Sequence, residues 1–115
     1  MLRVSSQMTG TDVDMAAVNG AGLADAGVAH GAALLALTEA VMRGAAATVE
    51  RQDLRGVLSA EGLVDVAAVI GAFNTVDRIA DATGIALDAA MDLMSKALRQ
   101  QLDLGRFASA ANTPP

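Results

Sequence analysis

The sequence contains no cysteine and only one histidine, His30. Without cysteine the chain can form neither a disulfide nor a thiolate metal site, and it has no thiol for redox chemistry. One imidazole is too few for a site built from several histidines, and it makes a Ser-His-Asp triad a weak hypothesis. We therefore expect neither a metal ion nor a cofactor in this chain.

Basic residues and aromatic rings are also scarce. The chain has 13 acidic and 8 basic residues, a net charge of −5, and its aromatic side chains are Phe73 and Phe107. Nucleic-acid binding needs dense Lys and Arg and often stacking rings, so we expect no nucleic-acid partner. No apolar stretch reaches the roughly 18 residues that span a bilayer, and no apolar segment follows Arg3 as it would in a signal peptide. We expect no membrane partner and a cytoplasmic protein.

Proline stands only at the very end of the chain, as Pro114 and Pro115, whereas alanine, the strongest helix former, occurs 26 times. The sequence therefore predicts an all-α fold, a small bundle of about five helices. We expect one helical domain over residues 11–105, with flexible tails at residues 1–10 and 106–115. The predicted helices cover residues 12–18, 26–43, 49–58, 63–83 and 89–104.

Capping residues and glycines mark the ends of these helices. The expected N-caps are Asp25, Thr48 and Asp88, and the expected C-terminal glycines are Gly44, Gly84 and Gly105. Residues 59–62 are predicted to form a turn. Two further glycines, Gly27 and Gly31, lie in the first turns of the second predicted helix, where each costs roughly 1 kcal/mol relative to alanine. We expect their small size to let another backbone segment approach closely.

Three predicted helices carry apolar side chains at helical spacing. The clearest is residues 63–83, whose expected core face consists of Val66, Val69, Ile70, Phe73, Val76 and Ala80. The expected core faces of the second and fifth helices are Leu34, Leu37 and Val41, and Met91, Met94, Leu98 and Leu102. Because five short helices cannot comfortably cover so much apolar surface on the fourth of them, we expect a homo-oligomer.

Asn74, Arg78 and Asp81 are spaced i, i+4 and i+7 in the fourth predicted helix, so they form one polar stripe beside its apolar face. A guanidinium in this stripe offers a planar fork of donors to a carboxylate. One interpretation is a ligand site or an interface, with a small acidic or aromatic molecule as the ligand. The other is that Arg78 pairs with Asp81 or Asp77 within the helix, an arrangement worth only about 0.2–0.5 kcal/mol.

His30 and Glu39 are weak candidates for catalytic residues. A general base needs an orienting partner and a substrate proton within hydrogen-bond reach. Glu39 follows His30 by nine residues, which is too far along a helix for the carboxylate to orient the imidazole directly. A histidine that is partly buried or helps to cap the helix is the more common outcome at such a position.

The fourth predicted helix also carries a recognisable pattern. Residues 72–85 read Ala-Phe-Asn-Thr-Val-Asp-Arg-Ile-Ala-Asp-Ala-Thr-Gly-Ile, which resembles the C-terminal signature of the carboxymuconolactone decarboxylase-like superfamily, and most closely its alkylhydroperoxidase-D-like branch. Shorter stretches that resemble the family in the same order are residues 33–40, Asp53-Leu54 and residues 62–65. The resemblance extends over residues 32–88.

This resemblance implies an all-α fold and assembly into dimers, trimers or hexamers. Members of the peroxidase branch act through a Cys-x-x-Cys-x-x-x-His motif upstream of the matched region, and this sequence departs from that pattern because it has no cysteine. We therefore predict that thiol peroxidase activity is absent, and His30 falls in no such motif. Asn74, Arg78 and Asp81 match family positions, where the resemblance implies that they position helices near the active site or an interface.

Three functional hypotheses follow. The first is a non-peroxidase, helical homo-oligomer that binds a small molecule or a partner. The second is a cysteine-independent decarboxylase or lactone-type enzyme, in which His30, Glu39 or Arg78 supplies the acid–base group. The third is a structural subunit completed by another chain that carries the cysteine motif. A neighbouring gene encoding that missing half would favour the third hypothesis.

Overall fold

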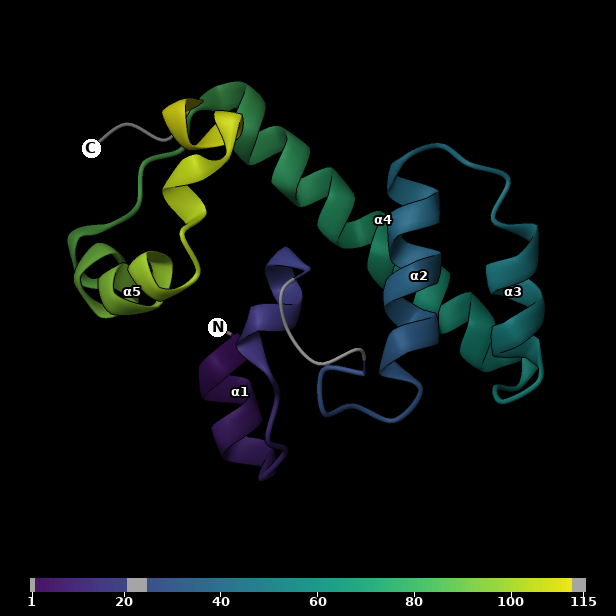
Figure 1. Ribbon diagram of the computed structural model, residues 1–115. Coiled ribbons are helices and arrows are strands. Elements are labelled where there is room, and N and C mark those ends of the chain that lie inside the picture. The colour runs from purple at the N-terminus through teal and green to yellow at the C-terminus, as the bar shows by residue number, and fades with distance from the viewer. Residues whose placement is uncertain (1, 21–24, 113–115) are drawn as a thin grey trace. The chain divides into compact units, whose positions relative to one another are not determined.

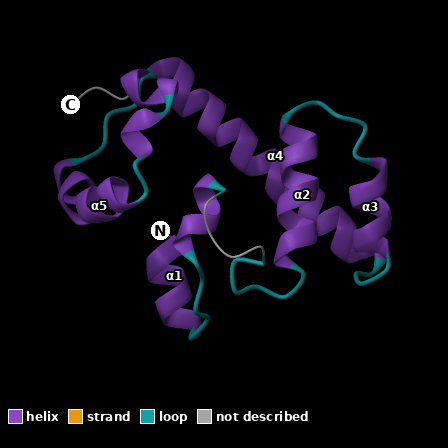
Figure 2. Cartoon of the chain, viewed as in Figure 1, coloured by secondary structure: helices purple, strands orange, loops and turns teal. Residues whose placement is uncertain are grey.

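The computed structural model describes residues 2–20 and 25–112, and every regular element in this part of the chain is helical (Figure 1, Figure 2). The α-helices are α1 (Leu2–Thr9), α2 (Gly31–Met42), α3 (Thr48–Arg55), α4 (Ala60–Thr83) and α5 (Ala89–Gln101). The 3-10 segments are η1 (Met15–Asn19), η2 (Leu104–Arg106) and η3 (Ala108–Asn112). The prediction of an all-α fold of about five helices is confirmed. Among the described helices, none is both long and apolar enough to cross a membrane.

Three of the predicted helix ends are confirmed by local geometry. Gly44 adopts φ +70° after α2, and its amide donates to the carbonyl of Val41 at 3.0 Å. Gly84 adopts φ +62° after α4, a left-handed conformation that suits glycine because it has no Cβ. At the start of α5, Oδ1 of Asp88 accepts a hydrogen bond from the amide of Met91 at 2.9 Å, as expected of an N-cap.

The start of α2 differs from the prediction. The helix begins at Gly31 because Ala26 and His30 adopt φ 55° and 58°, which interrupts the helical path expected from residue 26 onward. Asp25 therefore does not cap α2. Its Oδ1 accepts a hydrogen bond from the amide of Gly27 at 3.0 Å, which closes a local turn instead.

Left-handed residues also displace the ends of α3 and α5. Ala47, with φ 51°, occupies the cap position of α3, so Thr48 is the first residue of the helix rather than its N-cap. α5 ends at Gln101, because Asp103 adopts φ 50° before the chain reaches Gly105. Alanine seldom adopts a positive φ, and aspartate does so more often but not regularly, so neither position was predicted as a helix end.

Side-chain caps decide where α4 and η1 begin. Oγ of Ser59 accepts a hydrogen bond from the amide of Gly62 at 3.1 Å, so residues 59–62 form a cap and the first turn of α4 rather than a separate turn. In the segment predicted as a short helix over residues 12–18, Oδ1 of Asp14 accepts from the amide of Ala16 at 2.9 Å. The helix that follows is the 3-10 segment η1.

Gly27 and Gly31 allow the close backbone approach that the sequence predicted. A Cβ added at Gly27 would lie 2.3 Å from the backbone oxygen of Asp12. A Cβ added at Gly31 would lie 1.8 Å from the backbone oxygen of Asp25, far inside van der Waals contact. The amide of Asp14 also donates to the carbonyl of Ala26 at 3.0 Å. The hydrogen bond joins residues 12–14 to residues 26–27, and the missing side chain of Gly27 leaves room for the two backbones to lie this close.

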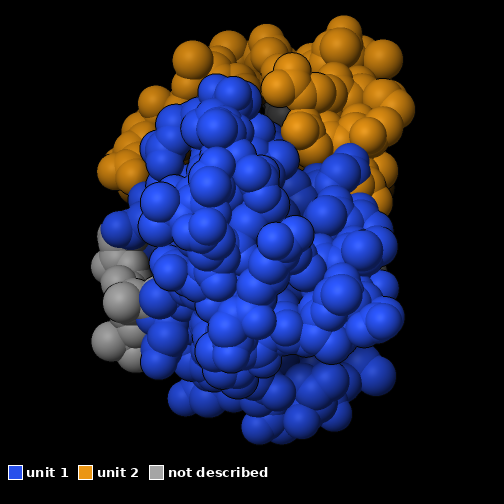
Figure 3. Space-filling model, turned by 90° about the vertical axis from the view of Figure 1, so that its right-hand side faces the viewer, with its two compact units in different colours: residues 1–71 blue, residues 72–115 orange. Residues whose placement is uncertain are grey.

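The structure divides into two compact units, residues 1–71 and residues 72–115, which we call unit 1 and unit 2 (Figure 3). The sequence predicted one helical domain with a flexible tail at each end. α1 occupies the first of these tails and η3 lies in the second, whose residues 113–115 are outside the described part. Helices this short carry too few residues for an apolar periodicity to be recognised, which is why the prediction left them as tails.

The core of unit 1 lies between α2, α3 and the first half of α4. Its buried side chains are Leu37, Ala40, Ala47, Leu54 and Ile70, and partly buried neighbours that pack against them are Ala33, Leu34, Leu58, Leu63 and Val66. Leu54, on the only polar-looking helix of the three, is completely buried. The expected core positions Leu34, Leu37, Val66 and Ile70 are thus confirmed.

Several other expected core positions are exposed, and the prediction was wrong for them. They are Val41 in α2, Val69, Phe73 and Val76 in α4, and Met94 in α5. Of the expected core face of α5, Leu102 is 4% exposed, and Met91 and Leu98 are partly buried. Periodicity identifies an apolar face, but it does not say how far along the helix a neighbouring element covers that face.

Candidate functional site

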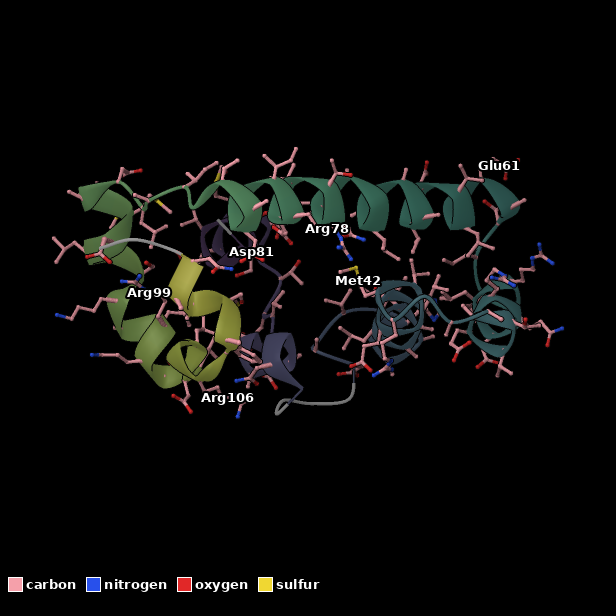
Figure 4. All side chains as sticks on the ribbon, turned by 90° about the horizontal axis from the view of Figure 1, so that it is seen from above. Met42, Glu61, Arg78, Asp81, Arg99 and Arg106 are labelled. Carbon is pink, nitrogen blue, oxygen red and sulfur yellow. The ribbon has the colours of Figure 1, made fainter. Side chains whose placement is uncertain are left out.

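The polar stripe of α4 contains a short hydrogen bond between two of its three predicted members. Nε of Arg78 donates to Oδ1 of Asn74 at 2.6 Å, one helical turn away (Figure 4). An amide oxygen that accepts this bond restricts the orientation of the guanidinium, and the two terminal NH₂ groups still carry four donors. The pair therefore presents an oriented cation on the exposed surface of α4.

Asp81, the third predicted member of the stripe, has a different partner. Its Oδ1 accepts a hydrogen bond from Nδ2 of Asn112 at 2.7 Å, which ties η3 to α4 across 31 residues of sequence. Within the described residues, neither Asp81 nor Asp77 forms an ion pair with Arg78. Arg78 therefore does not form the ion pair within α4 that the alternative interpretation expected.

Asn112 is a residue that sequence reasoning missed. It lies in the segment predicted as a flexible tail, and its partner Asp81 is 31 residues away. Helical spacing relates residues three or four apart, so it carries no signal for such a contact. The structure therefore brings Asn74 to Arg78 and Asn112 to Asp81, which makes two hydrogen-bonded pairs from the predicted stripe.

His30 and Glu39 are not brought together. His30 precedes α2, where it is exposed and its side chain makes no capping hydrogen bond. Glu39 lies near the other end of α2, about 13 Å along the helix axis at the usual rise per residue. Its Oε2 forms an exposed ion pair with Nη2 of Arg43 at 2.9 Å, an arrangement worth a few tenths of a kcal/mol. Neither residue has the surroundings that general acid–base chemistry needs.

The other titratable groups of the described residues do not indicate a metal site or a catalytic site either. No group of three or more His, Asp or Glu side chains in the described ranges is arranged to hold a metal ion. Glu61, in the first turn of α4, has its pKa lowered by a hydrogen bond from its own backbone amide and by the hydroxyl of Ser59 (Figure 4). A lowered pKa is usual for a carboxylate in the first turn of a helix, and the Glu61 side chain is fully exposed. The shift therefore does not indicate a catalytic group.

The most unusual feature of unit 2 is its apolar surface. We use the term unit 2 apolar set for its exposed large apolar side chains: Phe73, Val76, Ile79, Ile85, Leu87, Leu93, Met94 and Phe107. Phe73 and Val76 are 67% and 61% exposed. Among the large apolar side chains described in this unit, only Leu102 is buried. Arg106 covers part of one ring, since its guanidinium carbon lies 5.0 Å from the centroid of Phe107.

No family model, no curated protein and no solved structure matches this chain. The similarity of residues 72–85 to the carboxymuconolactone decarboxylase-like superfamily therefore stays a prediction from their own pattern. The Arg78 stripe and the unit 2 apolar set are the two features of the described residues that bear on function.

Proposed function

We propose that this chain is a thiol-free helical protein of the alkylhydroperoxidase-D-like type that acts as a homo-oligomeric binding protein and does not reduce peroxides. The observation that carries the proposal is the unit 2 apolar set. Monomeric proteins seldom leave so many large apolar side chains in water, and extensive exposed apolar surface marks an interaction site. Its burial in an assembly is favourable by roughly 25 cal/mol per Å² of apolar area removed from water.

The proposed lack of peroxidase activity rests on the composition. Peroxide reduction in the resembled branch depends on a pair of cysteines, and this chain has none. We expect the purified, metal-free protein to leave added hydroperoxide unconsumed beyond a buffer blank. Consumption that persists after a second, independent purification would contradict this part of the proposal.

Native mass measured by light scattering tests the oligomeric part. We expect a species larger than the 11.6 kDa chain, with a mass that rises with protein concentration if the assembly is weak. A well-folded monomer over the whole accessible concentration range would overturn the proposal. A poorly folded or aggregating chain would instead favour a structural subunit that another chain completes.

A cysteine-independent decarboxylase or lactone-type enzyme is the second candidate. What favours it is the hydrogen bond from Arg78 to Asn74, which orients a cation suited to a carboxylate or a lactone oxygen. We expect lactones or aromatic carboxylic acids to raise the melting temperature of the wild type and not of Arg78→Ala. Lys96→Ala, which removes an exposed basic side chain of the same unit, is the matched control. Equal shifts in all three proteins would exclude a ligand site at Arg78.

A further inference from the structure

All the sulfur in this chain is methionine sulfur, because the sequence has six methionines and no cysteine. An oxidant that attacks sulfur therefore meets only thioethers, and its rate at each of them depends on how accessible that sulfur is. Exposure differs widely among the methionines of the described residues. Met8 is 83% exposed, Met94 70% and Met42 44%, whereas Met15 and Met91 are partly buried. These side chains are consequently not equivalent targets.

Of the two most exposed methionines, only Met94 belongs to the unit 2 apolar set. It lies in α5 beside Leu93, which is 75% exposed, whereas Met91, three residues earlier in the same helix, is partly buried. Met8 lies in α1, in unit 1. A change of polarity at Met94 therefore alters the surface on which the proposed function depends, and the same change at Met8 does not.

We propose that Met94 is an oxidation site, whose thioether takes an oxygen atom from a hydroperoxide, and that this modification weakens apolar binding by unit 2. The O–O bond of the hydroperoxide breaks and an S–O bond forms, which leaves an alcohol, or water when the oxidant is hydrogen peroxide. The proton of the hydroperoxide leaves with that product. The sulfur gives up two electrons and the peroxide takes up two, so the step needs no other reactant.

This reaction is distinct from the catalytic peroxide reduction that we expect to be absent. Each sulfur reacts once, and a separate reductase is needed to return the sulfoxide to the thioether. A large excess of hydroperoxide therefore remains after every accessible methionine has reacted.

The sulfoxide changes what the Met94 side chain can contact. A flexible apolar side chain becomes polar and chiral, and its oxygen loses free energy if it is buried without a hydrogen-bond donor. Because reductases reverse the modification, the site can switch apolar binding off and on again. The oxidation follows from exposure and sulfur chemistry, and only its effect on binding rests on the proposed function.

The first experiment maps the oxidation. The full chain is treated with hydrogen peroxide at low protein concentration, where chains are separate and an assembly cannot shield the sulfur. Peptide mass spectrometry then follows each methionine over time. We expect Met8 and Met94 to be oxidised at least about fivefold faster than Met15 and Met91, because their sulfurs are more accessible. A rate at Met94 no greater than that at Met91 would overturn the inference.

The second experiment measures the effect on the apolar surface with the dye anilinonaphthalene sulfonate, which binds exposed apolar groups. Met94→Leu keeps an apolar side chain that cannot be oxidised, and Met8→Leu is the matched control at the other exposed methionine. We expect peroxide to weaken dye binding at least about twofold in the wild type and in Met8→Leu, and to leave Met94→Leu nearly unchanged. Equal losses in all three proteins would overturn the inference.

A further variant does without peroxide. Met94→Gln introduces a polar side chain of similar length and should reproduce the weaker dye binding in untreated protein. Should circular dichroism show that Met94→Leu has lost helix, treatment of oxidised wild type with methionine sulfoxide reductases takes its place. Dye binding must then recover as the Met94 sulfoxide disappears, and a loss that persists after its reduction would contradict the inference.

These outcomes are separate from the test of the proposed function. Native mass is measured on untreated protein, so a monomer would overturn the oligomeric proposal, while the peptide rates and the dye would still decide the role of Met94. If the wild type assembles but Met94 is not oxidised preferentially, the oligomeric proposal stands and the oxidation site is rejected.

Discussion

Unit 1 and unit 2 are both helical, yet they bury their apolar side chains to very different extents. In unit 1, two adjacent helices and the first half of α4 enclose a core in which Leu54 is completely buried. In unit 2, Leu102 is the one buried large apolar side chain among those described, whereas Phe73 and Val76 of α4 and Leu93 and Met94 of α5 are exposed. The described core thus lies mainly in unit 1, although unit 1 also exposes large apolar side chains such as Val49 and Val64.

α4 makes this difference especially clear because it contributes to both units. Leu63, Val66 and Ile70 in its first half belong to the unit 1 core, whereas Phe73, Val76 and Ile79 in its second half are exposed. The helix itself is continuous from Ala60 to Thr83. Regular helix geometry is therefore no measure of how well a segment is packed, since backbone hydrogen bonds form equally in both halves.

The largest expected effect is at the centre of the unit 1 core. Leu54→Ala should lower the free energy of unfolding by about 2–5 kcal/mol, because it removes a fully buried side chain and leaves a cavity. Leu93→Ala in unit 2, where the side chain is 75% exposed, should change it by less than about 0.5 kcal/mol. Urea denaturation at one fixed protein concentration measures both. Equal losses would remove the distinction between the two units.

A smaller effect is expected at the close backbone contact before α2. Gly31→Ala should destabilise the chain by about 1–3 kcal/mol, because the added Cβ meets a backbone oxygen of Asp25 that cannot move freely. Gly71→Ala, in α4 with no atom near the added Cβ, should stabilise it by about 0.5–1 kcal/mol. Thermal unfolding of both variants tests the signs, and a stable Gly31→Ala protein would show that the contact is loose.

In unit 2, the N-cap of α5 should matter locally. Asp88→Ala removes the acceptor for the amide of Met91 and should destabilise α5 by about 0.5–2 kcal/mol, whereas Asp88→Asn keeps an acceptor and should lose much less. Amide exchange is the suitable measurement, because it reports on α5 separately and α5 contains no buried residue. Faster exchange at Met91 with unchanged exchange at Leu54 is the expected result, and equal acceleration at both would show that the units unfold together.

The smallest effect concerns pH. The pKa of Glu61 is lower in the folded chain than its ordinary value of 4.5, so its ionised form stabilises α4 above that pH, and this contribution is lost as the pH falls through the folded value. The unfolding midpoint of Glu61→Gln should therefore lie slightly below that of the wild type at pH 7. The two midpoints should converge in acid, and a difference that grows below pH 4 would contradict the assignment.

The sequence allowed the local features of the fold to be predicted. Gly44, Gly84 and Asp88 end or begin helices as expected, because a left-handed glycine and an aspartate cap act over a few neighbouring residues. The start of α2 was missed because Ala26 and His30 adopt positive φ, which alanine rarely does and histidine does too seldom to be predicted from sequence. Their conformation is imposed by the contact with residues 12–14, which lies outside any local window.

The candidate site was predicted only in part, and for the same reason. Helical spacing placed Asn74 and Arg78 one turn apart, and the structure joins them by a hydrogen bond. It could not predict that Asp81 would bond to Asn112, or that Phe73 and Val76 would be exposed, because both depend on elements distant in sequence. The residue pattern within one helix shows which face is polar and which is apolar. Only the tertiary structure determines which other residues each face contacts.

Because Asn112 donates a hydrogen bond to Asp81, its side chain competes with any ligand for that carboxylate. Any ligand that is to donate a hydrogen bond to Asp81 must first displace the amide of Asn112. Because that amide belongs to the same chain, it acts at an effective concentration set by the 31 intervening residues rather than by the amount of protein in solution. A substitution of Asn112 can therefore change what Asp81 is free to bond without altering any residue of α4.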